Sequence, residues 1–388
     1  MSGLRQVYVC GGHCSAFGRF DDMSLIDLAL PALRSTLGAA CVDAQEINAA
    51  FVGNSFGGLL QNQESILGQV LLSAAGLHGV PVHNVKNACS SGSDAVHLAW
   101  SSIAHGQYDC VLVLGIEKMT HPDRSKTFSA LASVSDREPE SPDRSVFMDL
   151  NAERAVRYMN AYGATPRHFA MSVVKNRNHA LLNPRAALRK AITLDEVLCD
   201  RVITSPLTRA MCGGVSDGAA SLLLVSEAFA RKKSLTGVRL VASAVAGGHA
   251  NRGDGPTVTA RCAELAYNQA GVGPGDISLA EVHDPTAPQE LFDIEDVGLC
   301  ERGHAFELLE KGAFSLGGQV PVNVSGGLVA RGHPVAATGV AQIVEIAEQL
   351  EGRAGKAQVA NARLGLAQMA GGLIGDDSAV ATVHILSK

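Results

Sequence analysis

The chain alternates short runs of apolar residues with longer stretches in which apolar residues recur every three to four positions. Short apolar runs bounded by Gly, Asn or Asp are typical of buried strands, and the longer spacing predicts amphipathic helices. The predicted strands are 6–12, 49–54, 110–117, 220–226, 239–247, 279–284 and 378–386. The predicted helices, which have Gly near their ends, are 24–38, 94–106, 257–271 and 337–352. This alternation predicts an α/β fold.

Two segments about 230 residues apart follow the same plan. Residues 24–56 and 257–287 each show the pattern of a helix, a Gly turn, a short acidic link and a strand. After each comes a strand-to-helix junction with a reactive residue, Cys89 in the first and His333 in the second. An internal duplication is therefore predicted, and its pseudo-twofold axis would bring Cys89 and His333 together.

The two halves are expected to span residues 1–235 and 236–388. A segment of different composition, at about 118–215, is inserted into the first half. It is rich in Met, Arg, Asn and His and weak in strand patterns, which indicates a loop domain with short helices. Insertions of this kind on α/β scaffolds often carry substrate contacts. A surface excursion without a role fits the composition as well.

Composition narrows the classes of function. Of the 388 residues 46% are hydrophobic and 18% charged, the formal net charge is −6, and no dense Lys/Arg block occurs. These values argue against nucleic acid and anionic membranes as partners. No apolar run reaches transmembrane length, and the N-terminus lacks a signal-peptide layout. The last residues do not match a peroxisomal signal, so we expect a cytoplasmic protein.

Cysteine spacing bears on disulfides and metals. The nine cysteines are Cys10, Cys14, Cys41, Cys89, Cys110, Cys199, Cys212, Cys262 and Cys300. They are odd in number, scattered and without a CxxC pair, so neither a disulfide framework nor a structural zinc site is expected. The segment "CGGHC" carries possible metal ligands, but no second pair follows at a suitable spacing. We therefore predict no metal.

Cys89 lies where a predicted strand hands over to a helix, in "NVKNACSSGSDAVHLAW". A cysteine at the first helical turn faces unpaired backbone N–H groups and the positive end of the helix dipole. Both would favour the thiolate and lower the pKa of the thiol. The small residues that follow leave room for a substrate carbonyl, whose oxyanion backbone N–H groups could hold. A small residue that merely packs a tight junction fits the pattern equally well.

His333 lies in the Gly-rich segment "SGGLVARGHPVAATG". Pro334 suits the first position of a helix, which places His333 at or next to the N-cap. A helix N-terminus disfavours imidazolium, so His333 should stay neutral and able to accept a proton from a thiol. A histidine in a Gly-rich turn is often structural, but its place in the repeat, opposite Cys89, favours a functional role.

His283 ends the predicted strand in "LAEVHDPTAPQEL". The carboxyl ends of strands are where α/β proteins tend to place their sites. Asp284 could orient the ring of His283 or cap the next helix. Plain capping chemistry explains this pair as well as a site does.

Four segments, taken together and in order, resemble the thiolase superfamily. "NACSSGSDAVHLAWSSIAHGQYDCVLVLGIEKM" resembles the segment around the acylated cysteine of that family, and "MCGGVSDGAASLLLVSE" the segment that closes its N-terminal half. "PVNVSGGLVARGHPVAATGVAQ" resembles its Gly-His-Pro histidine motif. "EVHDPTAPQELFDIEDVGLCERGHA" is similar to the sterol-carrier-protein-type branch. The resemblance spans nearly the whole chain.

The resemblance implies a five-layered αβαβα thiolase fold, a homodimer, and coenzyme A as co-substrate with no permanently bound cofactor. It implies that Cys89 is the nucleophile, that His333 activates it and that His283 helps bind the thioester oxygen. Cys89 would attack a 3-oxoacyl-CoA, the Cα–Cβ bond would break, and CoA would remove the acyl group; condensation is the reverse path. The basic candidates for ligand contacts, which spacing does not rank, are Arg144, Arg154 and Arg157.

One departure from the family pattern concerns a second cysteine, which moves the proton on the enolate carbon. Most thiolases place it in a Cys-x-Gly motif near the C-terminus, and the sterol-carrier type places it directly after His-Asp. Here the C-terminal stretch "NARLGLAQMAGGLIGDDSAV" has no cysteine, and Pro285 follows Asp284. Ordinary acetoacetyl-CoA thiolase chemistry is therefore in doubt. The proton could be moved by His283, by His333 or by water, or by no group at all if the enzyme only transfers acyl groups.

These variants resemble a bacterial thiolase-like branch whose members often work with a small OB-fold, zinc-ribbon partner subunit. The thiolase subunit of benzoylsuccinyl-CoA thiolase is the member most similar in style. Relatives in this branch transfer acyl groups or cleave C–C bonds by a retro-aldol path that needs no nucleophilic cysteine. Three functions follow: a thiolase-type acyltransferase, which Cys89 favours, a retro-aldol acyl-CoA lyase, and a catalytically silent scaffold subunit.

Overall fold

The computed structural model describes residues 3–137 and 145–388. Its main feature is a nine-stranded sheet in the order β3-β2-β4-β7-β1-β8-β11-β10-β9. The strands of its N-terminal part are β1 (Val7–Cys14), β2 (Ala49–Gly53), β3 (Val82–Val85), β4 (Cys110–Lys118) and β7 (Asp217–Ser226). Those of its C-terminal part are β8 (Val238–Gly247), β9 (Leu279–Glu281), β10 (Leu364–Ile374) and β11 (Asp377–Ser387).

The two parts of the sheet mirror each other about the seam between β1 and β8. The seam is short, with Tyr8 opposite Arg239 and Val9 opposite Val238. From β1 outward the order is β7, β4, β2, β3, and from β8 outward it is β11, β10, β9. An isolated parallel bridge from Ala280 of β9 to Val322 takes the place that β3 has beside β2. The internal repeat seen in the sequence is therefore present in the topology.

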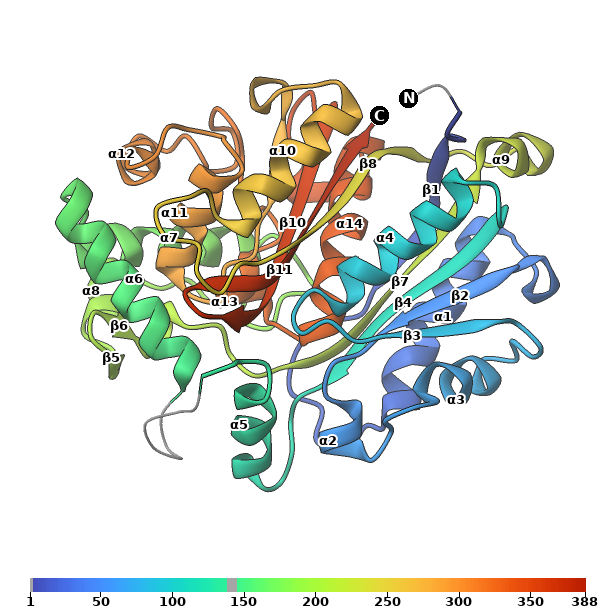
Figure 1. The fold of residues 1–388 in the computed structure, drawn as a ribbon, viewed down its shortest axis with the longest axis horizontal. Coiled ribbons are helices and arrows are strands. Elements are labelled where there is room, and N and C mark those ends of the chain that lie inside the picture. The colour runs from blue at the N-terminus through green and yellow to red at the C-terminus, as the bar shows by residue number, and fades with distance from the viewer. Residues whose placement is uncertain (1–2, 138–144) are drawn as a thin grey trace.

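Four long helices build the layers around this sheet: α1 (Leu25–Ala40), α4 (Ser91–Ala104), α10 (Val258–Ala270) and α14 (Val335–Glu351). α4 and α14 contact each other and the strands of both halves, so they form the central layer. α1 packs on β1 and β7, and α10 packs on β8 and β11, so these two form the outer layers. Figure 1 shows the N-terminal half in blue and cyan beside the C-terminal half in orange and red. This is the five-layered αβαβα arrangement that the resemblance implies.

The segment between β4 and β7 is mainly helical in its described part. It contains α5 (Arg124–Ala132), α6 (Val146–Tyr162), α7 (Pro166–Ala180), α8 (Leu194–Leu198) and a ribbon of β5 (Val202–Thr204) and β6 (Leu207–Thr208). α6 and α7 pack on α11 (Ala287–Asp296), and α7 also contacts α12 (Ala305–Glu310) and α13 (Gly327–Arg331). In Figure 1 these green helices lie beside the C-terminal half, where they can complete a site formed by both halves.

The remaining helices are short and lie on the N-terminal half: α2 (Gly57–Gln61), α3 (Leu67–Ala74) and α9 (Glu227–Lys233). Two strands of the nine-stranded sheet were missed from the sequence, as were the short strands β5 and β6 of the insertion. β3 is polar at its centre, and β10 contains Gln368 and three glycines, so neither shows a plain apolar run. The predicted strand 279–284 is also too long, because β9 ends at Glu281, and His283 and Asp284 lie in the loop that follows it.

Within the described ranges, no helix has the length and apolarity needed to cross a membrane.

Candidate active site

The structure brings Cys89, His283 and His333 together. Their sulfur and ring-nitrogen atoms all lie within 4.8 Å of one another, and the two imidazole ring centres are 5.4 Å apart. Cys89 lies between β3 and α4, His283 between β9 and α11, and His333 between the short helix α13 and α14, so each residue comes from a different loop that precedes a helix. The strand-to-helix junction predicted around His333 is therefore wrong, because α13 and not a strand precedes it. The prediction that the pseudo-twofold repeat juxtaposes Cys89 and His333 is confirmed.

Cys89 lies in a tight turn two residues before the first residue of α4. Ala88 has a left-handed backbone with φ of 47°, an uncommon conformation for a residue with a side chain. The hydroxyl of Ser91 accepts a hydrogen bond from the backbone N–H of Asn87 (2.8 Å) and donates one to the carbonyl of Ala88 (2.7 Å). Ser91 thereby fixes the turn that presents the thiol to the cavity.

Strand β10 passes unusually close to this turn. A Cβ atom on Gly371 would lie 2.9 Å from the backbone nitrogen of Cys89 and 2.8 Å from that of Ser90. Real Cβ atoms almost never approach backbone so closely, so glycine is required here for the close approach rather than for its φ angle. The approach also places the backbone N–H of Gly372 within hydrogen-bonding range of the Cys89 sulfur.

The prediction that the helix start lowers the pKa of Cys89 is wrong. Burial, and to a smaller extent the nearby Glu117 carboxyl, raise the pKa of this thiol to about 12. The backbone N–H groups of Gly372 and Cys89 itself oppose the shift without cancelling it. Cys89 precedes the helix instead of lying within its first turn, and desolvation of the charged form outweighs the local dipoles. In the free protein Cys89 is therefore a neutral thiol.

His333 is held as a proton acceptor. Its Nδ1 lies 2.8 Å from the hydroxyl of Thr338, and that hydroxyl donates its own hydrogen to the carbonyl of Pro334 at 3.0 Å. Since a hydroxyl has one hydrogen to donate, it must accept from Nδ1–H. Nε2 of His333 is then unprotonated, and it is buried without a hydrogen-bond partner in the described structure.

The pKa of His333 lies well below its usual range. Burial is the main cause, and the neighbouring His283 and the buried cation of Arg331 add to it. The predicted neutral state is therefore confirmed in direction, although desolvation accounts for it rather than the helix dipole. The sequence also placed the residue correctly, because Pro334 is the N-cap of α14 and His333 directly precedes it.

His283 faces the same cavity as His333. Its backbone N–H donates to the side-chain oxygen of Gln368 on β10 at 2.8 Å. Its Nε2 is buried without a described hydrogen-bond partner, and burial lowers the pKa of the ring to about 3. The ring is thus neutral, and its free nitrogen can bind a ligand oxygen in the cavity.

Asp284 neither orients His283 nor caps the next helix, the two roles considered from the sequence. Its carboxyl oxygens accept hydrogen bonds from the backbone N–H of Leu328 (2.8 Å) and from the amide of Asn176 (3.0 Å). Asp284 therefore links the loop of His283 to α13, which leads to His333, and to α7 of the insertion. Burial and the nearby Glu290 raise its pKa.

Behind Asp284 lies a buried polar network that the sequence did not reveal. Lys175 of α7 forms an ion pair with Glu290 of α11 at 2.9 Å, and both side chains are almost fully buried. Asn323 donates to the same carboxylate at 2.8 Å. The residues of this network lie far apart in the chain and belong to no motif, so their spacing in the sequence did not predict the network.

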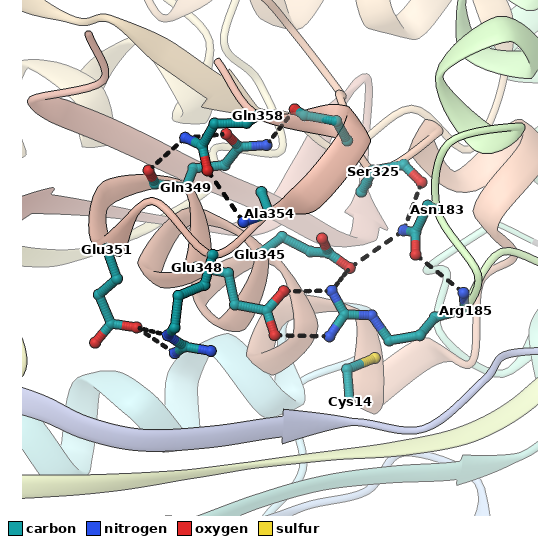
Figure 2. Close-up of polar contacts among 12 residues, drawn as sticks. Cys14, Asn183, Arg185, Ser325, Glu345, Glu348, Gln349, Glu351, Ala354 and Gln358 are labelled. Atoms are coloured by element: carbon teal, nitrogen blue, oxygen red, sulfur yellow. Dashed lines mark hydrogen bonds and ion pairs between the residues drawn. The ribbon is translucent and has the colours of Figure 1, made fainter. Parts of the chain in front are cut away.

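Helix α14, which follows His333, is anchored by a second polar cluster, shown in Figure 2. Arg185 of the insertion pairs with Glu348 through two hydrogen bonds of 2.9 and 2.5 Å and lies 2.9 Å from Glu345. Bidentate pairs of this kind fix both partners in orientation. The amide of Asn183 adds a bond to the carbonyl of Ser325 at 3.0 Å. The insertion thus helps fix the helix that follows His333.

The three residues line a cavity of about 130 Å³ between the halves and the insertion. Its apolar lining is Leu131, Val134, Phe147, Met148, Pro285, Ala370 and Leu373. Its polar lining, beside the three residues, includes Ser145, Asn151, Arg154, Gln289 and Ser378. Of the three arginines that spacing could not rank, Arg154 lines the cavity, Arg157 is exposed, and Arg144 lies outside the described residues.

A cysteine with two histidines is also a donor set that suits zinc. A structural zinc site needs four such ligands and a catalytic one needs three with the cysteine as thiolate. Within the described ranges no fourth His, Cys, Asp or Glu joins this group. A neutral thiol beside a free imidazole nitrogen fits acyl transfer better than metal binding.

Comparison with known proteins gives the family. The sequence matches the description "Thiolase, N-terminal domain" over residues 7–228 and "Thiolase C-terminal domain-like" over residues 249–388. The chain belongs to the thiolase superfamily. It is a thiolase-family enzyme that transfers acyl groups and uses acyl-CoA, as the resemblance implied.

Three relatives illustrate the range of this family. Acetyl-CoA acetyltransferase of Methanothermobacter thermautotrophicus is 37% identical over 99% of this chain and 100% of its own. Benzoylsuccinyl-CoA thiolase subunit BbsB of Thauera aromatica is 34% identical over 89% of each chain. Sterol carrier protein 2 of Bos taurus is 33% identical over 93% of this chain and 69% of its own.

Solved structures confirm the thiolase fold. The Ltp2-ChsH2(DUF35) aldolase superposes with a TM-score of 0.81 at 21% identity, over 100% of this chain and 99% of the other. Human mitochondrial 3-ketoacyl-CoA thiolase in complex with CoA superposes with a TM-score of 0.76 at 20% identity, over the same shares. At these identities the likeness establishes the fold and not the reaction.

In this thiolase both family positions for a second cysteine are occupied by other residues. Pro285 follows His283-Asp284, and the stretch 361–380 near the C-terminus has no cysteine but contains Ala370 two residues before Gly372, the spacing of a Cys-x-Gly motif. Both Pro285 and Ala370 line the cavity, so each is at the site and neither can carry a proton. Among the described residues of the lining, Cys89 is the only cysteine.

Proposed function

We propose that this thiolase cleaves a 3-oxoacyl-CoA with CoA, or condenses in reverse, through an acyl group carried on Cys89. The observation that carries the proposal is the pairing of a neutral Cys89 thiol with the free Nε2 of His333 in one cavity. The backbone N–H groups of Cys89 and Gly372 converge beside the same sulfur. They are suitably placed to hold the oxyanion that forms when the sulfur attacks a carbonyl.

Acylation begins with proton transfer from Cys89 to His333. Because the raised pKa of Cys89 and the lowered pKa of His333 disfavour a separated ion pair, the proton moves as the sulfur attacks the 3-oxo carbon. The S–C bond forms, the Cα–Cβ bond breaks, and the bonding electrons pass to the leaving acyl-CoA as its enolate. His283 donates a hydrogen bond to the enolate oxygen through Nε2–H.

The enolate carbon then needs a proton, which a second cysteine supplies in other thiolases. No other cysteine lines the described cavity, so His333 returns the proton that it took from Cys89. In the second half-reaction the CoA thiol attacks acyl-Cys89, loses its proton to His333, and the proton returns to the Cys89 sulfur. Both half-reactions balance without any further reagent.

A homodimer is part of the proposal, and the edge of the sheet supports it. Within the described structure β3 pairs only with β2, so its other edge is free to pair. An open groove of about 620 Å³ beside it includes Phe51, His83 and Leu98. Two copies joined along β3 would cover both features.

A small OB-fold, zinc-ribbon partner subunit is proposed as well. Two similar proteins are described as members of assemblies, one as a thiolase subunit and one as an Ltp2-ChsH2(DUF35) aldolase. Co-expression of the chain with candidate small partners, followed by size-exclusion chromatography, tests this part. A chain that elutes alone and is fully active alone would contradict an obligatory partner.

The competing reaction is retro-aldol cleavage, for which Pro285 and Ala370 are the supporting observation, because that path needs no second cysteine. The two reactions differ in their demand for CoA and for Cys89. Thiolysis of a 3-oxoacyl-CoA panel should require added CoA and be abolished in Cys89→Ala and His333→Ala. CoA-independent cleavage that survives in Cys89→Ala would assign the lyase reaction instead.

A further inference from the structure

The side chains that line the cavity change from apolar to polar along helix α6. Phe147, Met148, Asn151 and Arg154 all face the cavity, at the spacing of one helix face. The helix rises roughly 10 Å over the seven residues from Phe147 to Arg154. An apolar stretch is therefore followed by a polar end that contains a permanent positive charge.

The guanidinium of Arg154 is only partly used by the protein. Nη2 donates to the carbonyl of Asp376, and this is its one recorded hydrogen bond among the described residues. An arginine has five N–H donors in a planar fork, so most of its donors have no recorded protein acceptor. Within the described ranges it forms no ion pair, since no carboxylate oxygen lies within 4.0 Å of its nitrogens.

Acidic residues stand behind Arg154, but each has its own partner or is neutral. Asp377 lies 4.0 Å from Arg261, and Asp296 lies 3.6 Å from Arg302 and accepts from Thr257. Asp293 is fully buried, and burial raises its pKa well above the usual range, so it is protonated. The carboxylates of Asp377 and Asp296 attract the Arg154 guanidinium electrostatically without pairing with it.

The part of the cavity wall that the structure describes supplies no negative charge. No Asp or Glu is among its described lining residues, and its two histidines are neutral. Arg154 is partly buried and has no anionic partner among the described residues, so a ligand that supplies a negative charge would stabilise it. The volume of about 130 Å³ is well below the roughly 300–1,000 Å³ of pockets for drug-sized ligands, so it suits a short acyl group and not a nucleotide.

We propose that Arg154 makes this enzyme selective for acyl-CoA substrates whose acyl group carries a second, free carboxylate. The inference rests on the proposed acyl transfer at Cys89. While the thioester carbon lies at Cys89, the carboxylate of a dicarboxylic acyl chain lies against the guanidinium fork. Gln289 lies in the same wall of the cavity. Planar guanidinium groups match carboxylates with two parallel hydrogen bonds.

Acyl loading from matched pairs of donors tests this selectivity. Succinyl-CoA is compared with butyryl-CoA, and glutaryl-CoA with pentanoyl-CoA, because each pair differs only by a terminal carboxylate in place of a methyl group. The rate at which each acyl group appears on Cys89 is followed by intact-protein mass spectrometry. The readout is the ratio of the two rates within each pair, which cancels any general loss of activity.

The wild type is expected to load the carboxylated donor roughly tenfold to hundredfold faster than its partner, the range for a hydrogen bond to a charged group. Arg154→Met keeps the length of the side chain and should reduce the ratio to about one. Arg154→Lys should retain part of the preference. Arg157→Met removes the same charge from the exposed face one turn away and should keep the wild-type ratio.

Three outcomes would overturn the inference. A wild-type ratio near one in both pairs would refute it while leaving acyl transfer at Cys89 supported. Equal losses for all donors in Arg154→Met, with the ratio preserved, would show that Arg154 holds the fold or CoA instead. No loading from any donor would contradict acyl transfer at Cys89, and the inference would fail with it.

Discussion

The hydroxyl of Thr338 lies 2.8 Å from Nδ1 of His333 and donates its hydrogen to the carbonyl of Pro334. This single side chain, one turn into α14, fixes the tautomer of the histidine that precedes the helix. It leaves Nε2 unprotonated and free in the cavity. The capacity of His333 to accept the Cys89 proton thus depends on a residue five positions further along the chain.

Replacing Thr338 by valine tests this dependence. Thr338→Val keeps the shape but leaves Nδ1–H of His333 without an acceptor, which costs about 1–3 kcal/mol for a buried donor and frees the ring to turn. Acylation of Cys89 should slow by about tenfold or more. Thr338→Ser, which keeps the hydroxyl, serves as the control and should stay close to the wild type. Equal rates for both variants would refute the orienting role.

The raised pKa of Cys89 predicts slow alkylation of the free enzyme. With a pKa of about 12 the thiol is protonated at neutral pH, and only the thiolate reacts with iodoacetamide. The rate at Cys89, followed by peptide mapping because Cys41 and Cys199 are exposed, should rise about tenfold per pH unit from 7 to 9. A rate that is already at a plateau near pH 7 would show a stable thiolate and contradict the burial argument.

The close approach of β10 to the nucleophile turn predicts a strong effect of one methyl group. In Gly371→Ala the new Cβ would lie 2.8–2.9 Å from the backbone nitrogens of Ser90 and Cys89, so the strand or the turn must move. We expect a loss of about 1–3 kcal/mol in unfolding free energy and a marked loss of acylation. Gly247→Ala on β8, where a Cβ meets nothing within 4 Å, is the control. Similar activity in both variants would contradict the tight packing.

The buried pair of Lys175 and Glu290 predicts a strongly non-additive double mutant. Lys175→Met leaves the Glu290 carboxylate buried without its cation, which should cost about 3–5 kcal/mol in unfolding free energy. Adding Glu290→Gln removes the stranded charge and should recover part of that loss. Urea unfolding of the four proteins measures the coupling. Additive losses would mean that the pair does not act as a unit.

Sequence patterns were sufficient to predict the repeat and the juxtaposition of Cys89 and His333. Both residues precede long helices at corresponding places of the repeat, and such local turn chemistry is readable along the chain. The place of His283 beside them followed from the resemblance to the thiolase family and not from spacing. The pKa shifts and the buried hydrogen bonds of the site could not be predicted from the sequence. The pKa of Cys89 depends on burial by β10 and the insertion, and the role of Asp284 depends on Asn176, far away in sequence.

Intact-protein mass spectrometry of the wild type and Cys89→Ala, after incubation with the acyl-CoA panel, tests the central claim most directly. The account predicts an acyl adduct on the wild type alone, which disappears when CoA is added in excess. Folding of Cys89→Ala is checked by its melting temperature. No adduct on the wild type under any condition, with C–C cleavage surviving in Cys89→Ala, would contradict acyl transfer through Cys89.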